Sequence, residues 1–292
     1  MSVDLKEAAR ELSLAQQATP ANQSSTRGVR WGLKELWNYR QLIGIMVRRD
    51  FVGKYRGSLM GMFWPVINPL GHLLLYTFVF CVILKVKFSN DPSMSNFAVY
   101  VMAGYLPWGA LTEALAGATT SILEVPNLVK RVVFPLEVLP WVLVASSMLS
   151  AAVGMGLLVP LVCIYLKTIP WTLVFLPLIA LSQVLLLGGL SWMLAALGVF
   201  VRDVKHVIQL ALSVWMYVTP IVYPLKLVPA KLLPLYHLNP MAGMICDYRR
   251  VLLEGLPPDW PVFAGYTTMA VVAWLIGFNF FYKTKRSFAD VM

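Results

Sequence analysis

Charged residues are scarce in this sequence, since Asp, Glu, Lys and Arg together make up 13% of its 292 residues. Soluble domains carry about 25% charged residues and about 45–50% apolar ones. Here the apolar share is 59% and the mean hydropathy is +0.70. No charged residue occurs in positions 57–84, a stretch longer than the roughly 20 residues that a bilayer-crossing helix needs. The sequence therefore predicts an integral membrane protein.

Groups of metal-ligating residues are also missing. The cysteines Cys81, Cys163 and Cys246 stand alone, without a CxxC pair or any other ligand spacing, and the three histidines are equally scattered. We expect no metal site.

Nucleotide-binding and catalytic motifs are absent as well. No G-x-x-x-x-G-K-[ST] loop occurs, so the chain cannot hold ATP in the P-loop manner. Neither HExxH nor a nucleophile–base pair nor paired carboxylates appear at catalytic spacing. We expect a protein that is not an enzyme and binds no cofactor of its own.

The formal net charge of +10 has to be explained for a protein that is expected to lie in a membrane. The basic residues lie mostly beside apolar stretches, where the positive-inside rule and anionic lipid headgroups account for them better than nucleic acid does. Residues 1–30 contain Asp4, Lys6 and Glu7 and no apolar core, so they are not a signal peptide. We expect these residues to form a flexible tail in the cytoplasm.

Uncharged intervals predict an all-α protein with six transmembrane helices. The expected helices are residues 66–84, 97–119, 139–166, 173–200, 207–223 and 262–282. With this topology, 17 Lys and Arg residues lie on the inner side and 7 on the outer side. This bias predicts that both termini are cytoplasmic.

Before the first expected span, residues 31–56 have the pattern of an amphipathic helix. Leu36, Tyr39, Ile43, Met46 and Val47 follow the three-and-four spacing of one helix face. Such a helix would lie in the headgroup plane of the membrane. The alternative, a helix packed on a soluble domain, has no such domain in the sequence.

Two connections between expected spans are unusual. Pro126 and Pro135 bracket a short helix candidate in residues 124–140 on the inner side, where the alternative is a plain charged loop. Residues 224–261 on the outer side are too apolar for a solvated loop and too rich in proline for a span. Two short helices at 230–236 and 241–254 fit best, either re-entrant beside a pathway or lying on the membrane surface.

Ionisable and aromatic residues within the spans leave alternatives open. For Glu113 and His72 we favour structural hydrogen bonds over ion coupling, because the sequence shows no relay partners for them. Aromatic residues crowd the first, second and fifth spans, where they would form an interfacial belt or a stacking surface for sugar rings.

Four ordered stretches resemble one family. They are RRDFVGKYRGSLMGMFWPVINPL (48–70), NLVKRVVFPLEVLP (127–140), FVRDVKHVIQLALSVWMYVTPIVYPLKLVPAKL (200–232) and LNPMAGMICDYRRVLLEG (238–255). Together they resemble the permease subunit of ABC-2 type exporters of O-antigen, capsule or teichoic acid. The resemblance implies an interfacial helix at 31–56, a transmembrane domain at 57–283 and a cytoplasmic tail at 284–292 in the inner membrane.

The resemblance also implies partners: a second copy of this chain, two copies of a separate ATPase that binds ATP and Mg²⁺, and a lipid-linked glycan. The segment docking into the ATPase would be a coupling helix, with Pro126, Asn127, Leu128, Lys130, Arg131 and Phe134. The substrate pyrophosphate would meet Arg48, Arg49, Lys54 and Arg56 where it enters, unless these residues serve only as positive-inside anchors. The glycan would pass the channel aromatics Tyr76, Phe80, Trp108, Trp215, Tyr217 and Tyr223. The periplasmic gate would contain Leu232, Asn239, Pro240, Met241 and Arg249.

Two other functions remain open from the sequence. An ABC-2 permease for a small lipophilic substrate would have a narrow apolar pathway without an aromatic lining. An ion-coupled secondary transporter would need an internal repeat and intramembrane charge partners, and the sequence shows neither.

Overall fold

The computed structural model describes residues 37–83, 97–126, 134–225 and 228–291. These residues fold into helices joined by turns, and no strand occurs among them. The predicted all-α class is therefore confirmed for the described part of the chain. Of the predicted coupling segment, residues 127–133 lie outside it.

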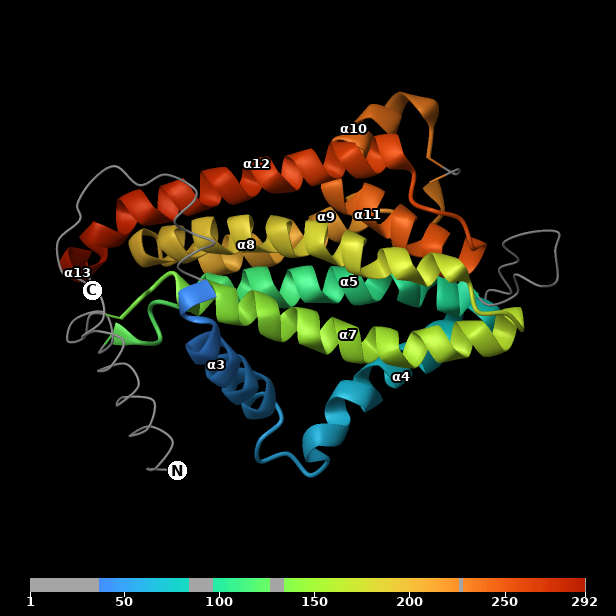
Figure 1. The fold of residues 1–292 in the computed structure, drawn as a ribbon, viewed down its shortest axis with the longest axis horizontal. Helices are drawn as coiled ribbons and strands as arrows, with labels where there is room; N and C mark the ends of the chain where they lie inside the picture. Colours follow the sequence, from blue (N-terminus) through green and yellow to red (C-terminus); the bar gives the residue numbers. More distant parts are fainter. Residues whose placement is uncertain (1–36, 84–96, 127–133, 226–227, 292) are drawn as a thin grey trace.

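Four long helices run side by side and form the bundle (Figure 1). They are α5 (Phe97–Ala118), α7 (Val138–Leu166), α8 (Leu176–Phe200) and α12 (Trp260–Thr284). α8 packs along α12 and α5 packs along α7, while the shorter α9 (Val204–Val218) contacts α5 and α8. Because the long helices are apolar on nearly all sides, as is typical of membrane helices, they can contact both protein and lipid.

Three of the six expected spans are long and apolar enough to cross a membrane, within the part of the chain that the structure describes. They are Val138–Ile164, Trp171–Phe200 and Trp260–Ser287. The first lies within α7, the second joins η4 (Trp171–Phe175) to α8, and the third joins α12 to η8 (Lys285–Ser287).

In the residues that the structure describes, the other three expected spans are not among the helices that are long and apolar enough to cross a membrane. With 15 residues, α9 is about 22 Å long, which is less than the roughly 30 Å of bilayer hydrocarbon. α4 (Trp64–Tyr76) contains Pro69 and passes into the π-helical η2 (Thr77–Ile83), and α5 carries Glu113. The count of six therefore stays a prediction.

The amphipathic segment forms α3 (Arg40–Gly53), which covers the middle of the predicted range 31–56. Its predicted apolar face contacts protein, because Met46 is buried against Val138, Leu139 and Val142 of α7. Past α3 the chain turns toward α4 through Gly57 and Gly61, whose φ values of 85° and 48° favour glycine.

The proline-rich segment in residues 224–261 contains two short helices in its described part, where the sequence predicts them. α10 (Leu233–His237) continues η6 (Ala230–Leu232), and α11 (Pro240–Arg249) continues into η7 (Arg250–Glu254). Figure 1 shows α10 and α11 away from the end of the bundle that carries α13 (Phe288–Val291). Ile43 of α3 packs against the same cluster as Phe288, so α3 begins near α13.

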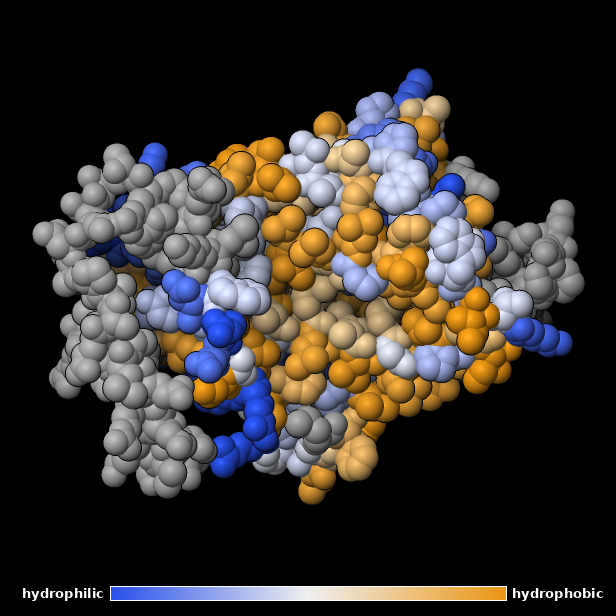
Figure 2. Space-filling model, in the orientation of Figure 1, coloured by the Kyte–Doolittle hydropathy of each residue, from blue (hydrophilic) through white to orange (hydrophobic). Residues whose placement is uncertain are grey.

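Hydrophobic side chains cover the middle of the face seen in Figure 2, and hydrophilic ones gather on the side where α3 lies. Exposed apolar residues such as Leu74, Ile164 and Leu181 come from different helices around the bundle. An apolar band of this kind is expected where lipid is the solvent.

Candidate functional site

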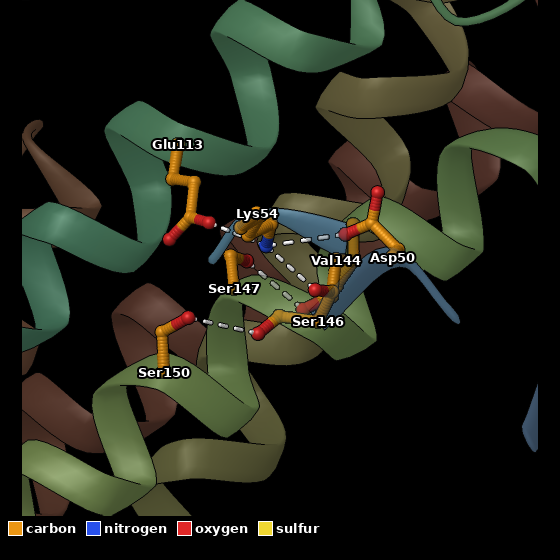
Figure 3. A network of polar contacts seen from close by, with 7 residues as sticks. All are labelled: Asp50, Lys54, Glu113, Val144, Ser146, Ser147 and Ser150. Carbon is orange, nitrogen blue, oxygen red and sulfur yellow. Dashed lines mark hydrogen bonds and ion pairs between the residues drawn. The ribbon is translucent and has the colours of Figure 1, made fainter. Parts of the chain in front are cut away.

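Lys54 is the centre of a charged network that joins three helices (Figure 3). It lies just after α3, and its Nζ is 3.2 Å from the Asp50 carboxylate and 2.5 Å from Glu113 Oε1 of α5. Nζ also donates a hydrogen bond of 2.6 Å to Ser146 Oγ of α7. Glu113 therefore has an ionic partner in the amphipathic segment, which its sequence context did not reveal.

The other residues predicted to meet the substrate headgroup occupy the same region. Arg48 and Arg49 lie in the second half of α3 and are exposed, and Arg56 follows Lys54 and is exposed too. The structure thus separates this basic group into exposed guanidinium groups and one lysine whose ammonium contacts two carboxylates.

Asn239 fixes the beginning of α11. Its side chain accepts hydrogen bonds from Met241 N at 3.1 Å and from Trp215 Nε1 at 3.0 Å, and it donates to Thr219 Oγ1 at 3.0 Å. Pro240 follows at the first helical position, where its missing N–H is not needed. Among the predicted gate residues, Asn239 and Met241 are buried, whereas Leu232 is 49% exposed.

Arg249 is buried at the other end of α11. Its guanidinium donates hydrogen bonds to the carbonyls of Pro220 and Ile221, both at 2.5 Å, and to the carbonyl of Tyr100 at 3.1 Å. It also lies 3.6 Å from the centre of the Tyr100 ring. Arg249 thereby ties α11 to the beginning of α5 and to the segment after α9.

Asp247 connects α11 with α12. Its carboxylate accepts hydrogen bonds from the Tyr266 hydroxyl and from the Asp259 N–H, both at 3.0 Å. Burial raises the pKa of Asp247, while these two hydrogen bonds favour its ionised form. α11 is therefore positioned by buried polar side chains and not by apolar packing alone.

A chain of buried hydrogen bonds crosses the bundle near Pro107. Gln183 Nε2 donates to the Pro107 carbonyl at 2.7 Å, and the Tyr248 hydroxyl donates to Gln183 Oε1 at 2.9 Å. These bonds link α5, α8 and α11. The sequence analysis did not single out Gln183 or Tyr248, although a glutamine within an uncharged span was a usable signal.

The predicted channel aromatics come from several elements, and those whose side chains are described differ in their burial. Trp108 and Trp215 meet edge to face, with ring centroids 5.7 Å apart, in the main core cluster. Tyr217 is 70% exposed, whereas Tyr223 is half-buried and hydrogen-bonded to Tyr236. The remaining two, Tyr76 and Phe80, belong to α4 and η2 respectively.

Tyr76 lies beside a histidine–tyrosine pair that joins α4 and α5. The His72 ring stacks on Tyr105 at 4.7 Å between centroids, and the Tyr105 hydroxyl is 3.0 Å from His72 Nε2. Because His72 Nδ1 is 2.9 Å from the Asn68 carbonyl, it donates there and leaves Nε2 as the acceptor for Tyr105. His72 thus makes the structural hydrogen bonds that the sequence analysis favoured.

Only the two ends of the predicted coupling segment are described. Pro126 is exposed, and Phe134 is half-buried and packs with the cluster that joins α3 and α7. Asn127, Leu128, Lys130 and Arg131 lie outside the described residues.

Glu137, just after this segment, is bound to the C-terminal part of the chain. Its Oε1 is 3.1 Å from Lys285 Nζ, and its carbonyl accepts a hydrogen bond from Trp192 Nε1 at 2.9 Å. The Glu137 side chain is only 9% exposed, against 27% for Lys285. The base of α7 is thereby held to α8 and to the end of α12.

We expect Lys285→Met to lower the free energy of unfolding by about 2 kcal/mol, because it leaves a buried carboxylate without its cation. Glu137→Gln combined with Lys285→Met removes both charges and should cost less than Lys285→Met alone. Thermal unfolding in detergent measures both effects. A double variant less stable than Lys285→Met would contradict this reading of the pair.

The described residues contain no group of three or more His, Cys, Asp or Glu side chains that could hold a metal ion.

Comparison with known proteins extends these observations. The family described as ABC-2 type transporter matches residues 41–250 of this chain. An O-antigen export system permease protein RfbA from Myxococcus xanthus is 30% identical over 261 residues, which cover 88% of this chain and 98% of that protein. A protein of the same name from Klebsiella pneumoniae is 27% identical over 252 residues, covering 86% of this chain and 95% of that protein.

Proposed function

This chain belongs to the ABC-2 type transporter family, and from that premise we propose that it is the membrane-spanning subunit of an ATP-driven exporter of lipid-linked polysaccharide. The observation that carries the proposal is the near full-length similarity to O-antigen export permeases. As a member of this family it is a multi-pass transport protein, and the apolar helices α7, α8 and α12 agree with that role.

The working assembly in this proposal contains two copies of this chain and two copies of a separate ATPase in the cytoplasmic membrane. The ATPase binds ATP and Mg²⁺ and pushes on the coupling segment, residues 126–134. α3 and α13 pack into neighbouring clusters at one end of the bundle, which supports placing both of these segments on the same side of the membrane. Six membrane crossings would place α10 and α11 on the periplasmic side, as gate helices.

The polar anchors of α11 support a gate that moves as a unit. Asn239, Arg249 and Asp247 bind α11 to the segment after α9, to α5 and to α12. A movement transmitted along α12 or α5 would therefore carry α11 with it. In this mechanism the glycan passes between the two copies when their gate helices separate.

Co-expression with a candidate ABC ATPase from the same genome tests the proposal. We expect the ATPase to copurify with the wild-type chain, and Lys130→Glu/Arg131→Glu to abolish both this association and the export of glycan. Reversal of the two charges replaces attraction at a docking surface by repulsion.

Arg202→Glu/Lys205→Glu is the matched control, because it reverses two basic residues in another predicted cytoplasmic turn. This control should still retain the ATPase. If no ATPase copurifies with the wild type, and the isolated chain moves substrate on an ion gradient, the chain is a secondary transporter and the proposal is wrong.

A further inference from the structure

The Lys54 ammonium group, which has three N–H donors, lies close to the oxygen atoms of three side chains (Figure 3). The acceptors are Asp50 and Glu113, through their carboxylates, and Ser146, through its hydroxyl. An incoming anion therefore competes with these three groups for the Lys54 ammonium group. Arg48 and Arg49, which lie in α3 before Lys54, are exposed.

Glu113 is the acceptor that can leave most easily. Asp50 lies in α3, four residues before Lys54, and Ser146 is a buried residue of α7. The Glu113 side chain is 38% exposed, the largest value of the two carboxylates in the network, and it has one more rotatable bond than Asp50. Its departure would open the lysine from the side of α5.

A phosphate would replace Glu113 without loss of hydrogen bonding. Both groups are anions that only accept hydrogen bonds from an ammonium group. With Glu113 in place, however, the network holds two carboxylates and one ammonium group, so its net charge is negative and repels an anion. The Glu113 carboxylate thus occupies the position beside Lys54 that an external anion would take.

We propose that Glu113 is an internal competitor for Lys54, which the phosphate group of an anionic lipid displaces when it binds between α3 and α5. Lys54 is then the residue that binds the anion, and competition from Glu113 raises the anion concentration that is needed to occupy it. The lipid as the source of the phosphate rests on the proposed function. A plain structural tether between α3 and α5 is the rival explanation, and it predicts no effect of Glu113 on anion affinity.

Equilibrium binding of tritiated farnesyl pyrophosphate to the full-length chain in neutral detergent distinguishes the internal competitor from the structural tether. Because the ATPase is left out, its nucleotide site cannot take up the pyrophosphate group. We expect Glu113→Gln to bind the probe about tenfold more tightly than the wild type, because it removes a competing charge and keeps the size of the side chain. Lys54→Met should abolish this gain when it is combined with Glu113→Gln.

Two further variants keep the result interpretable. Glu113→Asp shortens the side chain and should also tighten binding, to a smaller extent, which provides a second test if Glu113→Gln does not fold. Glu124→Gln, at an exposed carboxylate that accepts a hydrogen bond from Thr120, should leave the affinity unchanged. Affinity equal to or weaker than that of the wild type in folded Glu113→Gln or Glu113→Asp would overturn the proposal.

Competitors identify the ligand. Inorganic pyrophosphate should compete weakly and farnesol should not compete in a Lys54-dependent manner. Competition by inorganic pyrophosphate as strong as that by farnesyl pyrophosphate would overturn the assignment to a lipid. Because this assay contains no ATPase, its failure is separate from failure of the exporter assembly, which is measured by copurification.

Discussion

Replacement of Gly277 by alanine is expected to destabilise the bundle by about 3 kcal/mol and to lower its melting temperature by about 10 °C. Gly277 of α12 faces Gly189 of α8, and a Cβ at position 277 would meet the Gly189 carbonyl oxygen in severe overlap. A Cβ at Gly189 would in turn lie 2.4 Å from the Ala273 carbonyl group. The two backbones touch here, so neither can yield by a change of rotamer.

The expected stability change at Gly277 is opposite in sign to that of Gly→Ala at an open helical position. In an open helical position, Gly→Ala stabilises a helix by roughly 0.5–1 kcal/mol, because alanine loses less backbone entropy on folding. Gly265 lies in the same helix with no atom within 4 Å of its would-be Cβ. Gly265→Ala is therefore the control, and it should raise or preserve the melting temperature in detergent. Equal melting temperatures for Gly277→Ala and Gly265→Ala would show that the helices separate easily at this crossing.

The long uncharged intervals were enough to predict where the helices lie. The expected spans 139–166 and 262–282 fall on α7 (Val138–Leu166) and α12 (Trp260–Thr284), because lipid and protein interior both require apolar residues. The same patterns could not reveal how the helices pair, since apolar helices have no charged side to indicate a neighbour. The close crossing at Gly189 and Gly277 depends on the absence of side chains in two helices distant in sequence.

Polar partners were the least predictable part of the candidate site. Glu113 was expected to make structural hydrogen bonds, yet its ionic partner Lys54 lies outside the apolar spans and reaches it from the end of α3. The partners of Arg249 are main-chain carbonyls, which carry no sequence signal. The apolar sequence around a charged residue predicts that the residue needs a partner. Which group that partner is depends on how segments distant in sequence pack together.

Arg249→Met is expected to cost about 4 kcal/mol in unfolding free energy, because the buried carbonyls of Pro220 and Ile221 each lose their donor. The guanidinium group is planar and has five N–H donors, which allows it to reach both carbonyls and the Tyr100 carbonyl together. Gly104 leaves room for it, since a Cβ there would lie 2.8 Å from Arg249 Nη2. Tryptophan fluorescence during thermal unfolding measures the loss.

Two substitutions separate charge from geometry. Arg249→Lys keeps the charge, but a single ammonium nitrogen cannot span the same carbonyls, so its stability should fall between those of the wild type and Arg249→Met. Arg250→Met removes the neighbouring arginine, which is half-buried and donates one hydrogen bond to the Pro257 carbonyl, and should cost about 1 kcal/mol. If Arg249→Lys were as stable as the wild type, charge alone would hold α11, and the forked hydrogen bonds would be dispensable. A loss with Arg249→Met no larger than with Arg250→Met would instead mean that α11 is held by its apolar contacts with α5 and α12.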